Sequence, residues 1–217
     1  MGQLGQAGQA VDSLSELKSL TQSCVARLAQ FLCKRTVKNA LDTMEKPSDV
    51  WNLTTKTEDP VSQWCDAIIE QLEFHHDELK EYGFPDEIVH DIMSAFVQGI
   101  ASLIVDYIQN YKGSITGIGA FTLYRDLQSL TMHMTEHGGQ DQCSELVELL
   151  VVSKSVAFGD FQALIDIKDT DSARDLAALR VSFLEKVVNS SAKVENLEPI
   201  SRAKALSIIK RLKDNFF

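Results

Sequence analysis

Apolar residues recur at intervals of three and four along most of this chain, which is the spacing of amphipathic α-helices. The first such stretch runs from Leu14 to Leu41 and contains no glycine or proline. Its apolar stripe consists of Leu14, Leu17, Thr21, Cys24, Leu28 and Phe31. We therefore expect one long helix that turns this stripe toward a core.

Seven further helices are predicted from the same periodicity and from start and stop signals. Asp59 and Pro60 suit the N-cap and the first position of a second helix, because the N–H that proline lacks would stay unpaired there. A third helix begins at Pro85, and a fourth ends at the glycine pair Gly138 and Gly139. The predicted apolar stripe of the second helix consists of Val61, Trp64, Cys65, Ile68, Leu72 and Leu79, and that of the fourth consists of Leu123, Leu127, Leu130 and Met134. The remaining four are expected near residues 142–155, 158–167, 172–188 and 199–217.

The predicted fold is all-α, a stacked antiparallel helical bundle of about eight helices, since no segment shows the two-residue alternation of a half-buried strand. Residues 1–12, rich in glycine and glutamine, are predicted to be a flexible segment. Residues 13–217 are predicted to form one helical-rod module. A division of this module into two sub-bundles would fall near residues 112–120.

Gly113, Gly117 and Gly119 stand close together before the fourth helix and raise the question of a phosphate-binding loop. A P-loop requires a lysine directly after its last glycine, where this chain has Ala120. A dinucleotide-binding fingerprint requires a third glycine where Thr122 stands, and a preceding strand. We therefore reject both nucleotide sites and expect the small residues to let two helices approach closely.

The formal net charge of −10 is concentrated in one segment. Between Glu58 and Asp91 there are eleven acidic residues and one basic residue, Lys80, so the rest of the chain is neutral, with 20 acidic (31 minus 11) and 20 basic (21 minus 1) residues. Such a chain has no general attraction to nucleic acid. Two candidate partner-binding surfaces follow, an acidic stripe (Asp66, Glu70, Glu73 and Asp77) and a basic tail (Lys210, Arg211 and Lys213). The alternative role of the acidic stripe is solubility alone.

Two E-x-x-H steps, Glu73 with His76 and Glu87 with His90, suggest a di-metal carboxylate bundle enzyme as the alternative from another functional class. At 100° per residue, however, Glu87 and His90 lie nearly opposite the apolar stripe of their helix, and Glu73 lies at the edge of its own stripe. The four residues therefore fit a solvated face better than an inward-facing metal site.

A second possible metal set, His133, His137 and Cys143, lacks the second thiol pair of a structural zinc site and the glutamate base of a catalytic one. No serine or cysteine stands in a nucleophile-elbow sequence. The sequence therefore predicts no enzyme, no cofactor and no metal. A helical adaptor that holds one peptide in a groove remains a further alternative.

The four cysteines are far apart and occupy apolar positions of helical patterns, which favours buried thiols in a reducing, cytosolic compartment. They are Cys24, Cys33, Cys65 and Cys143. The N-terminus shows no secretory signal pattern. The most apolar run, residues 95–105, is shorter than the roughly 20 residues that cross a bilayer, so no transmembrane segment is predicted.

The order of landmarks resembles the C-terminal helical domains of vesicle-tethering complex subunits of the helical-rod type, with subunit four of the conserved oligomeric Golgi complex nearest in pattern. The likeness includes the Trp51-Asn52 pair, the run Asp59-Pro60-Val61 and the stretch LAALRVSF at residues 176–183. It also includes a stretch of the form small-Gly-x-aromatic followed by acid-Leu-x-Ser-Leu, formed here by Gly119, Phe121, Asp126, Leu127, Ser129 and Leu130. The chain departs from this pattern at Gln128, where the family has arginine, and in its last helix.

The resemblance implies a non-catalytic module that acts in Golgi membrane trafficking through protein contacts. Its partners would be sister subunits, SNAREs, SNARE regulators or small GTPases. Its location would be cytoplasmic and peripheral to the Golgi or another target membrane. A C-terminal domain of an exocyst subunit is the alternative within the same class.

Overall fold

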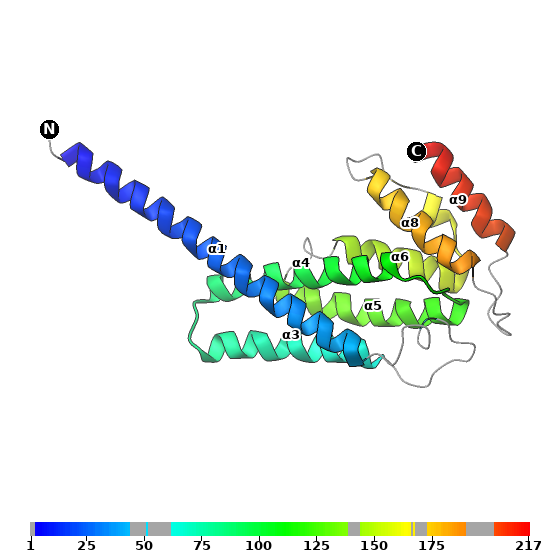
Figure 1. Cartoon of the computed structure of the whole chain (residues 1–217), viewed down its shortest axis with the longest axis horizontal. Helices are drawn as coiled ribbons and strands as arrows, with labels where there is room; N and C mark the ends of the chain where they lie inside the picture. The colour runs from blue at the N-terminus through cyan, green and yellow to red at the C-terminus, as the bar shows by residue number, and fades with distance from the viewer. Residues whose placement is uncertain are drawn as a thin grey trace.

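The computed structural model describes residues 3–43, 51, 62–138, 144–165, 167, 173–189 and 202–217. These residues form eight α-helices and no strand, which confirms the predicted all-α fold (Figure 1). The helices are α1 (Gln3–Thr43), α3 (Gln63–Glu81), α4 (Asp86–Asn110), α5 (Gly117–Gly138), α6 (Ser144–Phe158), α7 (Gln162–Ile165), α8 (Ala173–Val188) and α9 (Arg202–Phe216). The domain boundaries near residues 12 and 112–120 stay predictions.

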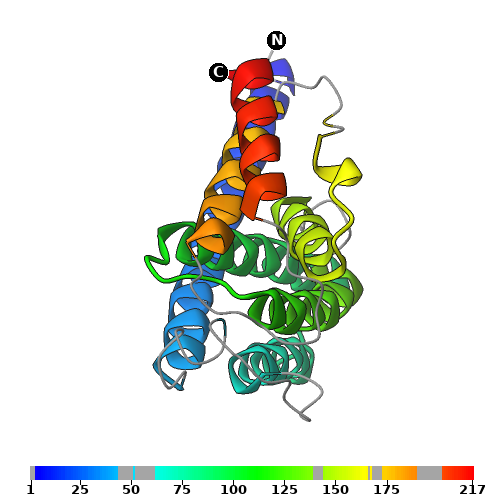
Figure 2. The same ribbon diagram turned by 90° about the vertical axis from the view of Figure 1, so that its right-hand side faces the viewer.

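The helices α3, α4, α5 and α6 lie side by side, and α1 runs obliquely across α3 and α4 (Figure 1). A tight turn at Gly83, with φ of +75°, joins α3 to α4 and makes them antiparallel neighbours, as expected. At the other end of the molecule α8 and α9 pack against each other, next to α4, α6 and α7 (Figure 2). The result is a stack of helices with long exposed sides.

The centre of the stack is α4, whose buried residues include Ile92, Met93, Phe96 and Ile100. By length and apolar composition alone, α4 would also qualify as a membrane-crossing helix, the single such helix among the described residues. Half of its most apolar stretch is buried against neighbouring helices, an arrangement that core helices share. The eleven-residue run considered in the sequence is thus part of a longer apolar helix.

The predicted core stripes of the second and fourth predicted helices, α3 and α5, are confirmed, apart from Val61, which lies outside the described residues. On α3 the buried apolar residues are Trp64, Cys65, Ile68, Leu72 and Leu79, and on α5 they include Leu123, Leu127, Leu130 and Met134. These stripes repeat at three and four residues and meet α4 from both sides. For these helices the sequence periodicity is a sufficient guide to the buried face.

Of the three glycines near the start of α5, Gly119 serves close packing, as expected, whereas nothing lies within 4 Å of a Cβ position on Gly117. A Cβ atom on Gly119 would lie 1.7 Å from the backbone oxygen of Trp51, so only glycine fits there. The Thr116 N–H donates to the same Trp51 oxygen at 3.0 Å, and the Gly119 N–H donates to Thr116 Oγ1 at 2.9 Å. The start of α5 is therefore fixed against the buried Trp51, whose ring contacts Tyr107 and Tyr111 edge to face.

The predicted buried stripe of the first helix is wrong. Leu17, Cys24, Leu28 and Phe31 are exposed, and Cys24 is therefore not the buried thiol that the sequence suggested. The face that packs on the bundle instead carries Ala29, Leu32, Cys33, Thr36 and Ala40. This face consists of smaller residues, which let α1 approach α4 closely. Cys33 and Cys65 are buried as expected, and Cys143 lies outside the described residues.

Three helices also differ from the predictions in their boundaries. The N-cap residue of α3 is Ser62, whereas the predicted cap, Asp59, and Pro60 lie outside the described residues. The sixth predicted helix is reduced to α7, four residues long, because Gly159 with φ of +72° ends α6 only after Phe158. In α1, helix begins at Gln3, well before the first residue of the predicted pattern.

Candidate functional surfaces

The acidic stripe lies on the solvent face of α3, with Asp66, Glu70, Glu73 and Asp77 all exposed. The helix has its apolar residues on the opposite face, so the four carboxylates form one line along the outside of the bundle. Asp66 is in the first turn of α3, where the partial positive charge of the helix terminus stabilises a carboxylate. The helical periodicity that places the apolar residues of α3 in the core therefore also places these four acids together on the surface.

Histidines from α3 and α5 border the acidic stripe. His133 Nε2 lies 4.0 Å from Glu73 Oε1, and His76 Nδ1 lies 3.3 Å from Asp77 Oδ1. The rings of His76 and His137 are 4.7 Å apart between centroids. Burial, and then the neighbouring His76, lower the pKa of His137. The imidazoles therefore sit beside the carboxylates at the α3–α5 contact.

These side chains do not form a metal site in the described part of the chain. Glu87 and His90 are exposed on α4, as the sequence analysis expected, and Glu73 is 57% exposed. Among the residues that the structure describes, no group of three or more histidine, cysteine, aspartate or glutamate side chains is placed to hold a metal ion. Cys143, which was considered as a ligand and set aside in the sequence, lies outside those residues.

The basic tail lies on the exposed face of α9. Lys210, Arg211 and Lys213 are all exposed, and Lys213 Nζ lies 2.9 Å from Glu185 Oε1 on α8. This exposed ion pair contributes at most about 1 kcal/mol to the α8–α9 contact. Arg211 also lines a surface cleft of about 330 Å³ between α9 and the segment around Asp160. The tail therefore serves partly to dock α9.

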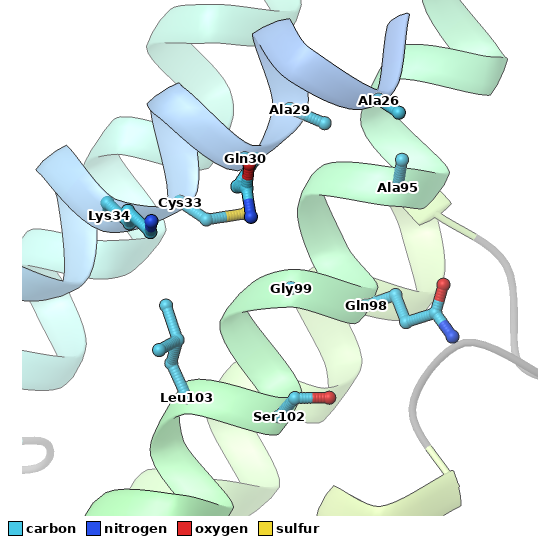
Figure 3. Close-up of a pocket in the computed structure, with 10 residues that line it drawn as sticks. All are labelled: Ala26, Ala29, Gln30, Cys33, Lys34, Ala95, Gln98, Gly99, Ser102 and Leu103. Atoms are coloured by element: carbon cyan, nitrogen blue, oxygen red, sulfur yellow. The ribbon is translucent and has the colours of Figure 1, made fainter. Parts of the chain in front are cut away.

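A second cleft, of about 410 Å³, lies between α1 and α4 (Figure 3). Small residues from both helices line it, with Gln30, Lys34, Gln98 and Ser102 among the polar ones. The Cys33 thiol donates to the Phe96 oxygen at 3.1 Å, and a Cβ atom on Gly99 would lie 2.4 Å from Cys33 Sγ. Because burial raises the pKa of Cys33 to about 12, this cysteine is a packing residue rather than a nucleophile.

Two buried charged residues were not identified as structural from the sequence. Asp126 on α5 has no exposed surface, and its Oδ1 accepts the Ser62 N–H at 2.9 Å. Ser62 makes no side-chain cap of its own, so Asp126 caps α3 from a neighbouring helix. Burial is the main cause that raises the pKa of Asp126 to about 6.

The second buried charge is Arg180 on α8. It pairs through Nε with Glu148 on α6 and donates through its NH1 group to the carbonyl oxygens of Ala163, at 3.2 Å, and Leu164, at 2.7 Å. One guanidinium thus connects α6, α7 and α8. Asp126 and Arg180 fall in two of the stretches that carry the family resemblance, and this was the signal in the sequence that could have pointed to them.

No protein-family model, curated protein or solved structure matches this chain.

Proposed function

We propose that this protein is a non-catalytic module of a multisubunit vesicle-tethering complex that acts in Golgi membrane trafficking through protein–protein contacts. The observation that carries the proposal is the continuous acidic stripe on the outer face of α3 in an all-helical antiparallel stack. The order of sequence landmarks supports the same class. An exocyst subunit is the alternative within it.

The buried charged groups are consistent with this proposal because each holds helices together. Asp126 caps α3, and Arg180 joins α6, α7 and α8. These two side chains make hydrogen bonds inside the fold, so the outer faces of α3 and α9 are the chemically distinctive surfaces. A stack of this kind presents long sides to partner subunits.

The acidic stripe suits a partner with a basic face. Four carboxylates at helical spacing attract cations along one line, which raises the association rate and fixes the register of the contact. SNAREs, their regulators, small GTPases and sister subunits are the proposed partner classes. The protein would then be cytoplasmic and held at the Golgi or another target membrane through these partners.

The test is affinity capture from the source cells, with identification of the proteins that co-purify. In the test variant Asp66, Glu70, Glu73 and Asp77 are replaced by lysine, and in a matched control the exposed acids Glu81, Glu87, Asp91 and Asp106 are replaced likewise. We expect tethering subunits with wild type and control, and their loss with the test variant. Equal capture by both variants would remove the stripe from the proposal. Near-stoichiometric iron or manganese in the purified protein would instead favour a metal enzyme.

A further inference from the structure

The exposed face of α1 carries an apolar stripe that no described part of the chain covers. Leu17, Leu20 and Phe31 are 61%, 62% and 61% exposed, Leu28 is 38% exposed, and Cys24 is exposed between them. At 100° per residue these five positions fall within an arc of about 80°. The opposite side of α1 is the one that packs on α3 and α4. We call this face, formed by the five residues, the α1 stripe.

The spacing of the α1 stripe is symmetric about its central residue. Leu20 and Leu28 each lie four residues from Cys24, and Leu17 and Phe31 each lie seven residues from it. In a twofold symmetric contact, if residue i of one copy contacts residue j of the other, then residue j of the first copy also contacts residue i of the second. A symmetric stripe on a helix therefore fits a second, antiparallel copy of itself.

We infer that two copies of this chain form a dimer in which their α1 helices pack antiparallel, with Cys24 of each copy at the twofold axis. In this register Leu17 packs against Phe31 of the second copy, and Leu20 packs against Leu28. Each contact occurs twice, so all apolar members of the α1 stripe are covered. Apolar side chains that recur at steps of three and four residues are the usual basis of contacts between two packed helices.

The charges beside the α1 stripe favour the antiparallel direction. Glu16 and Lys34 are both exposed and lie on the same side of the stripe, about 80° from its centre. In an antiparallel pair the twofold axis is perpendicular to both helices. The side of the stripe that carries Glu16 and Lys34 in one copy therefore lies next to the same side in the other copy. Glu16 therefore comes beside Lys34 of the second copy, at both ends of the contact. In a parallel pair Glu16 and Lys34 of the two copies would lie 18 residues apart along the axis and could not pair.

The basic residues of α1 give the same preference. Residues 17–41 contain five basic residues and no acidic one, and four of the five lie C-terminal to Cys24, namely Arg27, Lys34, Arg35 and Lys38. A parallel pair would align these cations side by side at a cost in free energy. The antiparallel pair places them at opposite ends of the contact.

There is room for a second helix along the whole stripe. Residues 15–24 are exposed, and the N-terminal half of α1 extends beyond the bundle (Figure 1). A partner helix can therefore lie along the outer side of α1 while each bundle remains on the far side of its own helix.

The first experiment measures the molar mass of the full chain in solution by size-exclusion chromatography with light scattering. We expect the wild type to have twice the mass of one chain and the variant Leu20→Glu/Leu28→Glu to have the mass of one. A matched control, Phe74→Glu/Met132→Glu, changes two exposed apolar residues on α3 and α5 and should remain a dimer. A monomeric wild type, or a dimer that survives the α1 substitutions, would overturn the inference.

The second experiment tests direction and register by exchanging charges. Glu16→Lys and Lys34→Glu should each raise the dimer dissociation constant about tenfold, because two attractive pairs become repulsive. The double variant should return to within about threefold of the wild type. Only self-association of this chain predicts such a rescue. Additive weakening in the double variant would refute the proposed arrangement.

The third experiment uses Cys24 as a reporter of the twofold axis. A short bismaleimide cross-linker should join two wild-type chains and should fail with Cys24→Ser, which keeps the dimer by light scattering. A dimer that forms but is never linked through Cys24 would refute the register.

Discussion

At the scale of single residues, the most informative group is Asp126, a carboxylate with no exposed surface. It caps α3 by accepting the Ser62 N–H, yet its ionised form is poorly solvated. Its pKa rises from the model-compound value of 3.8 to about 6. The folded state therefore binds a proton more tightly than the unfolded chain does. The stability from this group is complete below about pH 4 and is lost as the pH rises through about 6.

We predict that Asp126→Asn stabilises the protein at pH 7.5 by up to about 3 kcal/mol, because the amide oxygen still accepts the Ser62 N–H but carries no charge. The gain should shrink toward zero as the pH falls to about 4. Denaturant unfolding of variant and wild type from pH 4 to 8 would measure it. Asp106→Asn, at an exposed position, is the control and should show no such trend. A gain that does not vary with pH would show that ionisation of the buried carboxyl is not its cause.

The charge of Arg180, unlike that of Asp126, stabilises the fold, because it is paired with Glu148. We predict that Arg180→Met lowers the free energy of unfolding by about 3–5 kcal/mol, because Glu148 and two carbonyl groups then lose their partner. Removing Glu148 as well, in Arg180→Met/Glu148→Leu, should recover part of the loss. A double-mutant cycle by denaturant unfolding measures the coupling. Simple additivity of the two single changes would show that the pair is not coupled.

At the scale of helices, the entry into α5 depends on a contact that only glycine permits. We predict that Gly119→Ala costs about 3 kcal/mol of stability, because its Cβ would overlap the backbone of Trp51, which cannot move aside as a flexible side chain could. Gly117→Ala is the matched control, since nothing lies within 4 Å of that Cβ position. Thermal or chemical unfolding compares the two. Equal effects would mean that the close approach is not what requires glycine.

The helix α1 explains why periodicity predicted the wrong buried face. It carries two apolar faces, one with large residues such as Leu17 and Phe31 and one with smaller residues such as Ala29 and Ala40. Periodicity alone favours the larger and more regular stripe. The bundle instead takes the face that allows the closest approach to Gly99 on α4. The choice depends on the partner helix and is not visible in α1 itself.

At the scale of the whole molecule, two surfaces of different chemistry are proposed to act separately. The acidic stripe on α3 would act through charge, and the α1 stripe mainly through apolar contact. Charge interactions across exposed surfaces weaken as the screening length falls from about 10 Å at 0.1 M salt to about 3 Å at 1 M.

We predict that this change of salt lowers partner capture through the acidic stripe at least about tenfold, whereas the dimer dissociation constant rises by no more than about threefold. Capture assays and light scattering on the same samples would measure both. Equal loss of both contacts would show that the two surfaces are not independent.

The sequence predicted the all-α fold, the core stripes of α3 and α5, and the exposure of the acidic stripe and of Glu87 and His90. It also predicted the close packing that the structure shows at Gly119. These features follow from local periodicity and from the missing Cβ of glycine, and both are given by the residue types themselves. What it did not predict was Ser62 as the cap residue of α3, the short length of α7 and the exposed stripe of α1.

By itself the sequence determined where helices form and which face of most of them is apolar, because both depend on residues within a few turns of each other. Tertiary structure alone decided that Asp126 and Arg180 are buried, since their partners lie 64 and 32 residues away. It also decided which of the two apolar faces of α1 enters the core. Burying a charge requires a partner supplied by another helix, and choosing a face requires the shape of the helix opposite, so neither is encoded in a single segment.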